Sequence, residues 1–491
     1  MIGFLVASTL AIRFLHLAGK PFWFDECFSV EVARIGMGSF LRLLWWREAN
    51  MALYYLLLRI WLHFGQSEFF IRSLSVLIAA CTLPSIYWLA RLLYDRRVAF
   101  IAAALFAFNA YSVRYAQEAR SYALFLLLTT ISSGFLVAFV REPRRCHAWG
   151  YAIASVLAVY AHFYALLLLA AHWLALRALS RGEEVGPSVR RQMRRARIGI
   201  GVSVLPLLVF VAKTGAGPIK WISRPGLRDV LGFYEHLAGS ISWLLTLIVA
   251  LACIAAILPV WQRLRARGQN WETWRVQFLL LWLFFPVALT VTLSFARPVF
   301  LGRYMIFCLP ALLILAAAGL AELRPWWLMG TALVGILLLS LQGTVYVYGH
   351  DFDNERDASG TASNFILDHA EAGDAVLFHI AATRIAYEFF RSARAGTNTA
   401  SPNYTGGLGP EIIFPHHGAG LDYRDFTGKP TAEWVREQGA SHRRLWVMLM
   451  NNGPEGNPDP TTVMLVRALP ESFPRMESWQ FTKVEVRLYS K

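Results

Sequence analysis

Charged side chains are scarce in this chain of 491 residues. Asp, Glu, Lys and Arg make up 16% of it, whereas a soluble protein of this length carries about a quarter. Hydrophobic residues reach 56%, and apolar runs long enough to cross a bilayer recur along the chain. These features argue against a soluble globular protein and predict a polytopic α-helical membrane protein.

Cysteine is also rare. The chain has five cysteines, and none of them follows residue 308. No spacing of cysteines is typical of a metal site, and the tail has no Gly-rich phosphate loop and no dinucleotide-binding motif. We therefore expect no disulfide framework in the tail, no bound metal and no cofactor.

The net charge of +15 is unevenly spread. Residues 1–348 hold 33 Lys and Arg against 14 Asp and Glu, whereas residues 349–491 hold 14 against 18. This division predicts a membrane domain over 1–348 and a mildly acidic soluble domain over 349–491. The basic residues of the first domain lie in loops between apolar runs and not on one soluble face, which argues against nucleic acid as a partner.

The apolar runs predict about eleven transmembrane helices. The first is retained, because the N-terminus lacks the basic region and the cleavage site of a signal peptide. Residues 19–66 are expected to form the first outer loop with juxtamembrane helices. Within this loop Leu53–Phe64 is apolar but short for a span, so it is predicted to be a juxtamembrane or re-entrant helix. The predicted spans are 2–18, 69–93, 98–113, 119–140, 148–161, 163–180, 198–213, 237–260, 276–295, 304–321 and 326–347.

Loop charge predicts the orientation in the membrane. With the N-terminus inside, the short cytoplasmic loops carry 16 Lys and Arg in 47 residues, and the outer loops carry 11 in 70. This bias has the sign of the positive-inside rule. Residues 349–491 then lie outside the cytoplasm. Strand-like runs at 374–378 and 444–449 and a helix-like run at 361–372 predict a small α/β domain there.

Three polar clusters fall on the outer side under this topology. They are Asp25-Glu26 in the first outer loop, the stretch Arg114–Tyr122, and Arg297-Pro298 with Gly302-Arg303-Tyr304 at a later outer boundary. Carboxylates accept protons from attacking hydroxyls or amines. Arginines hold phosphates and stabilise negative charge that develops on them. A lipid-linked phosphosugar would present such a phosphate at the membrane surface.

Each cluster also has a purely structural interpretation. Arg120 and Arg303 are then interfacial arginines whose head groups reach water. Glu118 pairs with Arg114 or Arg120, and the tyrosines belong to the aromatic belt of the membrane. His162 lies near the outer end of two short spans, where a packed interfacial residue is the favoured interpretation.

The order of these motifs resembles the bacterial branch of the GT-C glycosyltransferases. It is similar to that of the protein O-mannosyltransferases and the lipid A aminoarabinose transferases, over about residues 1–347. The chain departs from the family at Asn50-Met51-Ala52, where members commonly carry His-Pro-Pro or Lys-Pro. The motifs that carry the resemblance are Asp25-Glu26, Leu53–Arg59, Ser67–Arg72, Tyr115–Tyr122 and Gly302-Arg303-Tyr304.

The resemblance implies a polyprenyl-phosphate sugar as donor and a site on the outer face of the bacterial inner membrane. By the motif match Asp25 is the base of an inverting transfer, with Glu26 beside it as the second predicted catalytic residue. The acceptor is a lipid, a glycan or a protein. The residues predicted to bind the donor phosphate or to shape the site are Asn50, Tyr54, Arg114, Glu118, Arg120, Tyr122, Arg303 and Tyr304.

The predicted function is therefore a membrane glycosyltransferase. A transporter or flippase for a lipid-linked sugar is the alternative, because it would also need arginines on the outer side. Transporters commonly show repeated halves or interrupted helices with polar groups near mid-membrane, and this sequence shows no internal repeat. A sensor with an outer binding domain would not need acids and arginines clustered in separate membrane loops.

Overall fold

The chain divides into two compact units in its computed structural model. The first unit contains Met1–Gly19, Leu44–Leu57 and Phe69–Phe352. The second contains Lys20–Leu43, Leu58–Glu68 and Asp353–Lys491. The domain boundary after residue 348 stays a prediction, but two segments of the first outer loop group with the tail. The structure describes residues 2–46, 48–179, 187–214, 222–239, 241–267, 270–350, 356–394, 409–415, 429–450 and 459–491.

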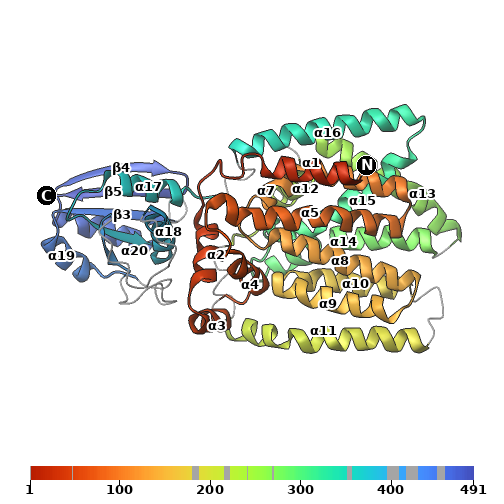
Figure 1. Cartoon of the computed structure of the whole chain (residues 1–491), viewed down its shortest axis with the longest axis horizontal. Coiled ribbons are helices and arrows are strands. Elements are labelled where there is room, and N and C mark those ends of the chain that lie inside the picture. Colours follow the sequence, from red (N-terminus) through yellow and green to blue (C-terminus); the bar gives the residue numbers. More distant parts are fainter. Residues whose placement is uncertain are drawn as a thin grey trace. The chain divides into compact units, whose positions relative to one another are not determined.

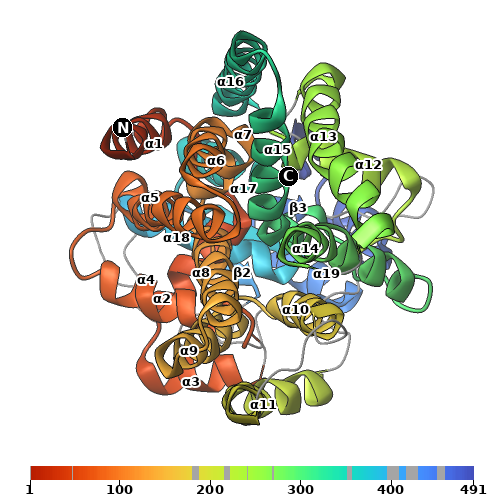
Figure 2. The same ribbon diagram turned by 90° about the vertical axis from the view of Figure 1, so that its right-hand side faces the viewer.

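The described residues of the first unit form helices joined by loops, with no strand among them. Most of its helices run side by side in Figure 1, and Figure 2 looks along them, with α15 placed among α6, α13 and α14. The helices are α1 (Ile2–Phe14), α5 (Glu68–Leu93), α6 (Arg96–Phe108), α7 (Ala110–Ala116), α8 (Tyr122–Arg141), α9 (Arg145–Ala161), α10 (Ala165–Leu179), α11 (Pro187–Thr214), α12 (Leu227–Leu237), α13 (Trp243–Arg267), α14 (Trp271–Ser294), η2 (Gly302–Cys308), α15 (Leu309–Glu322) and α16 (Trp326–Gly349).

Seven helices among the described residues are long and apolar enough to cross a membrane. The number rises to eight if α6 and α7, which meet at a bend of 58°, form one span. The other three predicted spans are the shorter helices α1, α9 and α10, of 13, 17 and 15 residues. The polytopic helical class is confirmed, and the number of crossings stays a prediction.

The break between α6 and α7 has a clear cause in the sequence. The Asn109 side chain accepts a hydrogen bond from the backbone N–H of Ser112 (2.9 Å) and so caps the start of α7. The buried Arg13 donates to the backbone carbonyls of Ala107 (3.0 Å) and Phe106 (3.2 Å) at the end of α6. Both helix ends are therefore satisfied inside the bundle, and α7 takes its own direction.

The second unit combines helices from the first outer loop with the C-terminal tail. Helices α3 (Met37–Trp46) and α4 (Ala52–Trp61) extend from one unit into the other, and α4 covers the run that was predicted to be a juxtamembrane helix. The other elements are α2 (Phe24–Arg34), α17 (Ser359–His369), β1 (Ala375–His379), η3 (Ala381–Thr383), α18 (Arg384–Arg394), β2 (Glu411–Phe414), α19 (Ala432–Ser441), β3 (Arg444–Met450), α20 (Pro460–Ala468), η5 (Leu469–Glu471), β4 (Arg475–Phe481) and β5 (Val484–Ser490).

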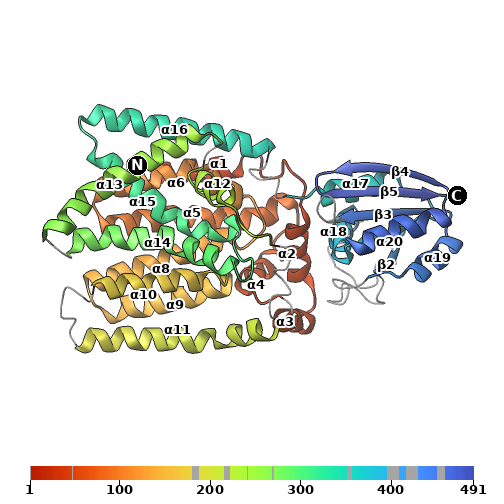
Figure 3. The same ribbon diagram turned by 180° about the vertical axis from the view of Figure 1, so that it is seen from behind.

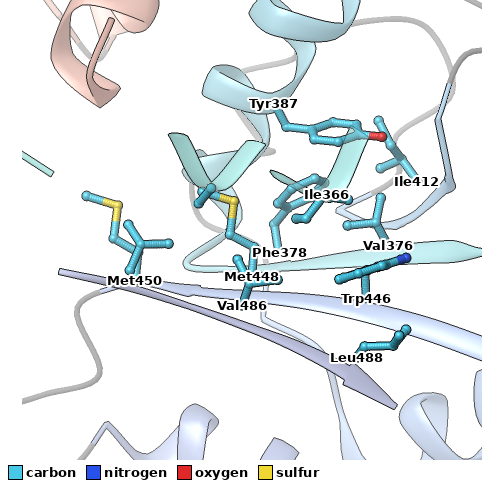
Figure 4. Close-up of a cluster of buried hydrophobic side chains, with 12 residues drawn as sticks. Ile366, Val376, Phe378, Tyr387, Ile412, Trp446, Met448, Met450, Val486 and Leu488 are labelled. Atoms are coloured by element: carbon cyan, nitrogen blue, oxygen red, sulfur yellow. The ribbon is translucent and has the colours of Figure 1, made fainter. Parts of the chain in front are cut away.

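The tail folds as a sheet with helices on both faces, in the strand order β2-β1-β3-β5-β4. Strand β1 pairs in parallel with β2 and β3, and β5 pairs antiparallel with β3 and β4 (Figure 3). Val376 and Phe378 face α17 and α18, while Ala375 and Leu377 face α19 and α20. Figure 4 shows the first of these two cores. The predicted α/β fold of the tail is confirmed.

Candidate active site

The turn between α7 and α8 carries the second predicted cluster, and it is buried. The Arg114 guanidinium lies 3.7 Å from the Glu118 carboxylate, with both side chains almost fully buried. Arg114 also donates to the Tyr115 hydroxyl (2.9 Å). The Tyr115 ring meets Tyr122 edge to face at 5.0 Å between centroids. The pairing of Glu118 with Arg114, one of the structural alternatives, is therefore present.

The third cluster lies beside this turn. It belongs to η2, the short 3-10 helix that precedes α15, and Arg303 is buried at its start. The Tyr111 hydroxyl of α7 donates to the Gly302 carbonyl (3.0 Å), which ties the two segments together. The Arg303 guanidinium lies 5.6 Å from the centre of the half-buried Tyr304 ring. Two motifs far apart in the sequence thus meet in one region of the first unit.

His162 is the residue around which these motifs gather. It is fully buried at the end of α9, and its ring centre lies 4.7 Å from that of Tyr304. Arg120 and Arg303 are both close enough to act electrostatically on its imidazole. Its Nδ1 accepts a hydrogen bond from the backbone N–H of Tyr164 (3.2 Å), so the proton of the neutral ring lies on Nε2. From the sequence alone, a packed interfacial residue is the favoured interpretation of His162.

Asn50 and Tyr54 have different surroundings. The Asn50 side chain accepts a hydrogen bond from the backbone N–H of Phe163 (3.0 Å), next to His162. This hydrogen bond joins Asn50-Met51-Ala52, the segment that departs from the family pattern, to the residue after His162. Tyr54 is fully buried, and its hydroxyl lies 3.1 Å from the Ser75 hydroxyl of α5. The structure therefore gives Asn50 a place beside the cluster and Tyr54 a contact with α5.

Asp25 and Glu26 belong to the second unit, in the first turn of α2. Asp25 is half-buried. Glu26 is fully buried, and its carboxylate lies 2.9 Å from the Arg356 guanidinium. That Asp25 joins the arginines in one active site stays a prediction. Across the described part of the chain, no group of three or more His, Cys, Asp or Glu side chains is arranged to hold a metal ion.

Comparison with solved structures identifies the fold. The apo structure of ArnT from Cupriavidus metallidurans aligns with a TM-score of 0.64 at 13% identity, covering 99% of this chain and 97% of that chain. ArnT bound to undecaprenyl phosphate aligns over the same shares with a TM-score of 0.63 at 11% identity. The apo oligosaccharyltransferase of Archaeoglobus fulgidus gives 0.50 at 10% identity, over 79% of this chain and 63% of that one.

Sequence comparison adds no relative. No protein-family model matches the chain, and no curated protein matches it. At identities this low the similarity to solved structures shows the fold. The predicted fold, with membrane helices followed by a small C-terminal α/β part, is confirmed, and it is similar to the fold of ArnT.

Proposed function

We propose that this chain is a glycosyltransferase of the bacterial inner membrane that uses a polyprenyl-phosphate sugar as donor. The proposal is carried by two buried arginines, Arg120 and Arg303, that both act electrostatically on the imidazole of the buried His162. Two cationic side chains held in one buried region suit a phosphate. In support, a solved structure of the same fold, ArnT, was obtained bound to undecaprenyl phosphate.

The proposed reaction is a single displacement at C1 of the sugar. Asp25 takes the proton from the attacking hydroxyl or amine of the acceptor. The acceptor atom forms a bond to C1 on the face opposite the phosphate, and the bond between C1 and the phosphate oxygen breaks. The leaving polyprenyl phosphate keeps that electron pair, and Arg120 and Arg303 stabilise its charge. Attack from the opposite face inverts the configuration at C1.

In this proposal His162 is a third residue, besides Arg120 and Arg303, that binds the donor phosphate. Because its Nδ1 accepts the Tyr164 N–H, its Nε2 carries the donor proton, and Nε2 has no hydrogen-bond partner among the described residues. A buried N–H without an acceptor is suited to donate a hydrogen bond to a phosphate oxygen. The Tyr304 ring packs against the imidazole. Glu118, in the turn between α7 and α8, pairs with Arg114 of α7.

The remaining partners follow from this chemistry. The bilayer holds the lipid tail of the donor, and the acceptor (a lipid, a glycan or a protein) approaches from the outer aqueous side. The C-terminal α/β part lies on that side in the predicted topology. The scheme assigns each step to side chains of the protein and to the donor itself.

The decisive experiment replaces Asp25. Purified protein in nanodiscs is incubated with radiolabelled polyprenyl-phosphate sugars and with extracts of the cell envelope as acceptors. The Asp25→Asn variant is expected to lose at least about 100-fold in transfer rate, because general-base catalysis contributes that much. Full activity in a folded Asp25→Asn variant would remove Asp25 from the chemistry.

A second experiment distinguishes transfer of the sugar from transport of the intact donor. Proteoliposomes that hold labelled donor in one leaflet report whether the label changes leaflet with its sugar still attached. A transferase releases the sugar from the lipid onto an acceptor, whereas a flippase moves the intact donor. Movement of intact donor without transfer would overturn the proposal.

A further inference from the structure

The helix that carries Asp25 has no cap of its own. Its N-cap residue, Trp23, makes no side-chain hydrogen bond to the helix, so the first N–H groups of α2 need another acceptor. The Asp357 carboxylate, from the start of the tail, accepts the Phe24 N–H at 3.2 Å. The same oxygen accepts the Ser359 N–H at 3.0 Å and so serves the start of α17. One carboxylate therefore joins two helix starts that are far apart in the sequence.

This cap lies beside Asp25, because Asp357 accepts the N–H of Phe24, the residue before Asp25. Burial raises the pKa of the Asp357 carboxyl, and the negative charge of Asp25 raises it further, against the opposing effect of the hydrogen bonds that it accepts. The charge of Asp25, the proposed base, therefore affects the pKa of Asp357.

Arg356 makes the second attachment. Its guanidinium lies 2.9 Å from the fully buried Glu26 carboxylate and donates to the Pro21 carbonyl at 3.1 Å. The same guanidinium lies 5.9 Å from the centre of the Trp23 ring. A buried carboxylate that loses a cationic partner is strongly destabilised. Arg356 therefore holds both the first turn of α2 and the segment that leads into it.

Close packing completes the attachment. Phe24 packs against the core between the sheet and α17, and Phe22 stacks on Phe389 of α18 with ring centres 5.1 Å apart. A Cβ at Gly360 would lie 2.3 Å from the Phe22 carbonyl oxygen, so only glycine permits this approach. At the other end of α2, Arg59 donates to the carbonyls of Ala33 (3.0 Å) and Ile35 (2.6 Å).

From these contacts we infer that the C-terminal part of the chain positions the catalytic base. The segment Arg356–Gly360 holds the first turn of α2, and Arg356 and Asp357 are positioning residues for Asp25. Glu26, predicted to be catalytic, is in this view the buried half of an ion pair that holds Asp25 in place. The inference rests on the proposed role of Asp25, and it gives the α/β part a role in the reaction itself.

The first test replaces the cap. Asp357→Ala is expected to lower kcat by about 10- to 100-fold, because small displacements of a catalytic group have effects of that size. The KM for the donor should stay unchanged, since the donor is proposed to bind in the first unit. Asp357→Asn keeps an oxygen that accepts the Phe24 N–H and should restore most of kcat. Equal loss in both variants would contradict a capping role.

The second test uses the ion pair. Arg356→Ala removes the guanidinium that pairs with the buried Glu26 carboxylate, so kcat should fall. The double variant Glu26→Gln with Arg356→Ala removes the buried charge and should recover at least part of the loss, which a double-mutant cycle measures. If Glu26 itself carries the chemistry, the double variant is as inactive as Glu26→Gln alone, and the positioning role assigned to Glu26 is wrong.

A matched control comes from the same part of the chain. Arg436 pairs with Glu471 at an exposed position (2.7 Å), with each side chain about half exposed. Arg436→Ala should leave kcat and KM unchanged, and thermal unfolding in detergent shows whether each variant is folded. If Asp25→Asn is inactive while folded Arg356→Ala and Asp357→Ala keep full kcat, the inference fails and the proposed function stands. If Asp25→Asn is active, the proposed function fails first.

Discussion

Buried arginines serve two different purposes in the first unit. Arg13 donates to the Phe106 and Ala107 carbonyls at the end of α6, and Arg72 donates to the Leu17 carbonyl at 2.9 Å. Both therefore satisfy backbone groups in a place without water. Arg120 and Arg303 instead lie beside a buried imidazole. Cationic side chains near a buried polar ring are more typical of ligand binding than of helix packing.

A substitution of His162 tests its proposed contact with the donor phosphate. The His162→Phe variant keeps an aromatic ring for Tyr304 and Phe125 to pack against but removes both ring nitrogens. The KM for the donor is expected to rise about tenfold or more, because a hydrogen bond to a charged group contributes about 1.5–3 kcal/mol. Steady-state transfer kinetics with varied donor concentration measure this change.

His172 provides the control for that prediction. It is equally buried, stacks on Phe278 at 5.7 Å, and lies 3.1 Å from the Ser133 hydroxyl through its Nε2. His172→Phe removes a buried imidazole from the same bundle and should leave the KM for the donor unchanged. A similar rise in both variants would mean that the effect comes from packing, and His162 would lose its proposed role.

Helix α15 depends on a very close contact with α13. A Cβ at Gly319 would lie 1.7 Å from the Ala252 carbonyl oxygen, so the two backbones touch at this point. Small residues at such crossings are typical of helix packing in membranes, where van der Waals contact replaces the hydrophobic effect as the driving force. This contact matters for the site, because η2 with Arg303 leads directly into α15.

Gly319→Val is expected to destabilise the first unit. The added side chain has no room, and overpacking in a well-packed interior costs about 1–3 kcal/mol or more. The midpoint of thermal unfolding in detergent should fall, and activity should be lost at a lower temperature. Gly330→Ala in α16 is the control, because a Cβ there meets nothing within 4 Å and alanine favours a helix over glycine. An unchanged midpoint for Gly319→Val would contradict the close packing.

Much at the level of elements could be predicted from the sequence. Long apolar runs predict the helices of the first unit, and alternation of strand and helix runs predicts the α/β tail, since both patterns are local. The grouping of α2 with the tail could not be predicted, because it depends on contacts such as that between Glu26 and Arg356, which no local pattern encodes. The break at Asn109 was missed for a related reason: a capping residue inside an apolar run looks like any other polar residue.

The candidate site could be predicted in part. The motifs Arg114–Tyr122 and Gly302–Tyr304 were singled out because polar residues at membrane boundaries are costly, and the structure brings them together. His162 carried no such signal, since a single histidine at a helix end is common. Its role depends on what surrounds it, and only the fold brings Tyr304 and the two arginines to it.

The orientation of the whole chain in the membrane, which loop charge predicts, can be tested by labelling exposed cysteines. Cys146 is exposed and lies in the predicted cytoplasmic loop 141–147, whereas Cys27, Cys253 and Cys308 are buried. Glu477 is exposed on β4, in the part predicted to lie outside. A Cys81→Ser background removes the other exposed thiol, so Cys146 and an introduced cysteine report the two sides of the membrane.

In right-side-out spheroplasts, a membrane-impermeant maleimide should label the Glu477→Cys variant at once. In a background that keeps only Cys146 accessible, label should enter only after the membrane is permeabilised, because the basic loops are held inside by the positive-inside bias. The pattern should reverse in inside-out vesicles. Labelling of Cys146 in intact spheroplasts would put the basic loops outside, and it would leave Asp25 without access to an acceptor on the outer face.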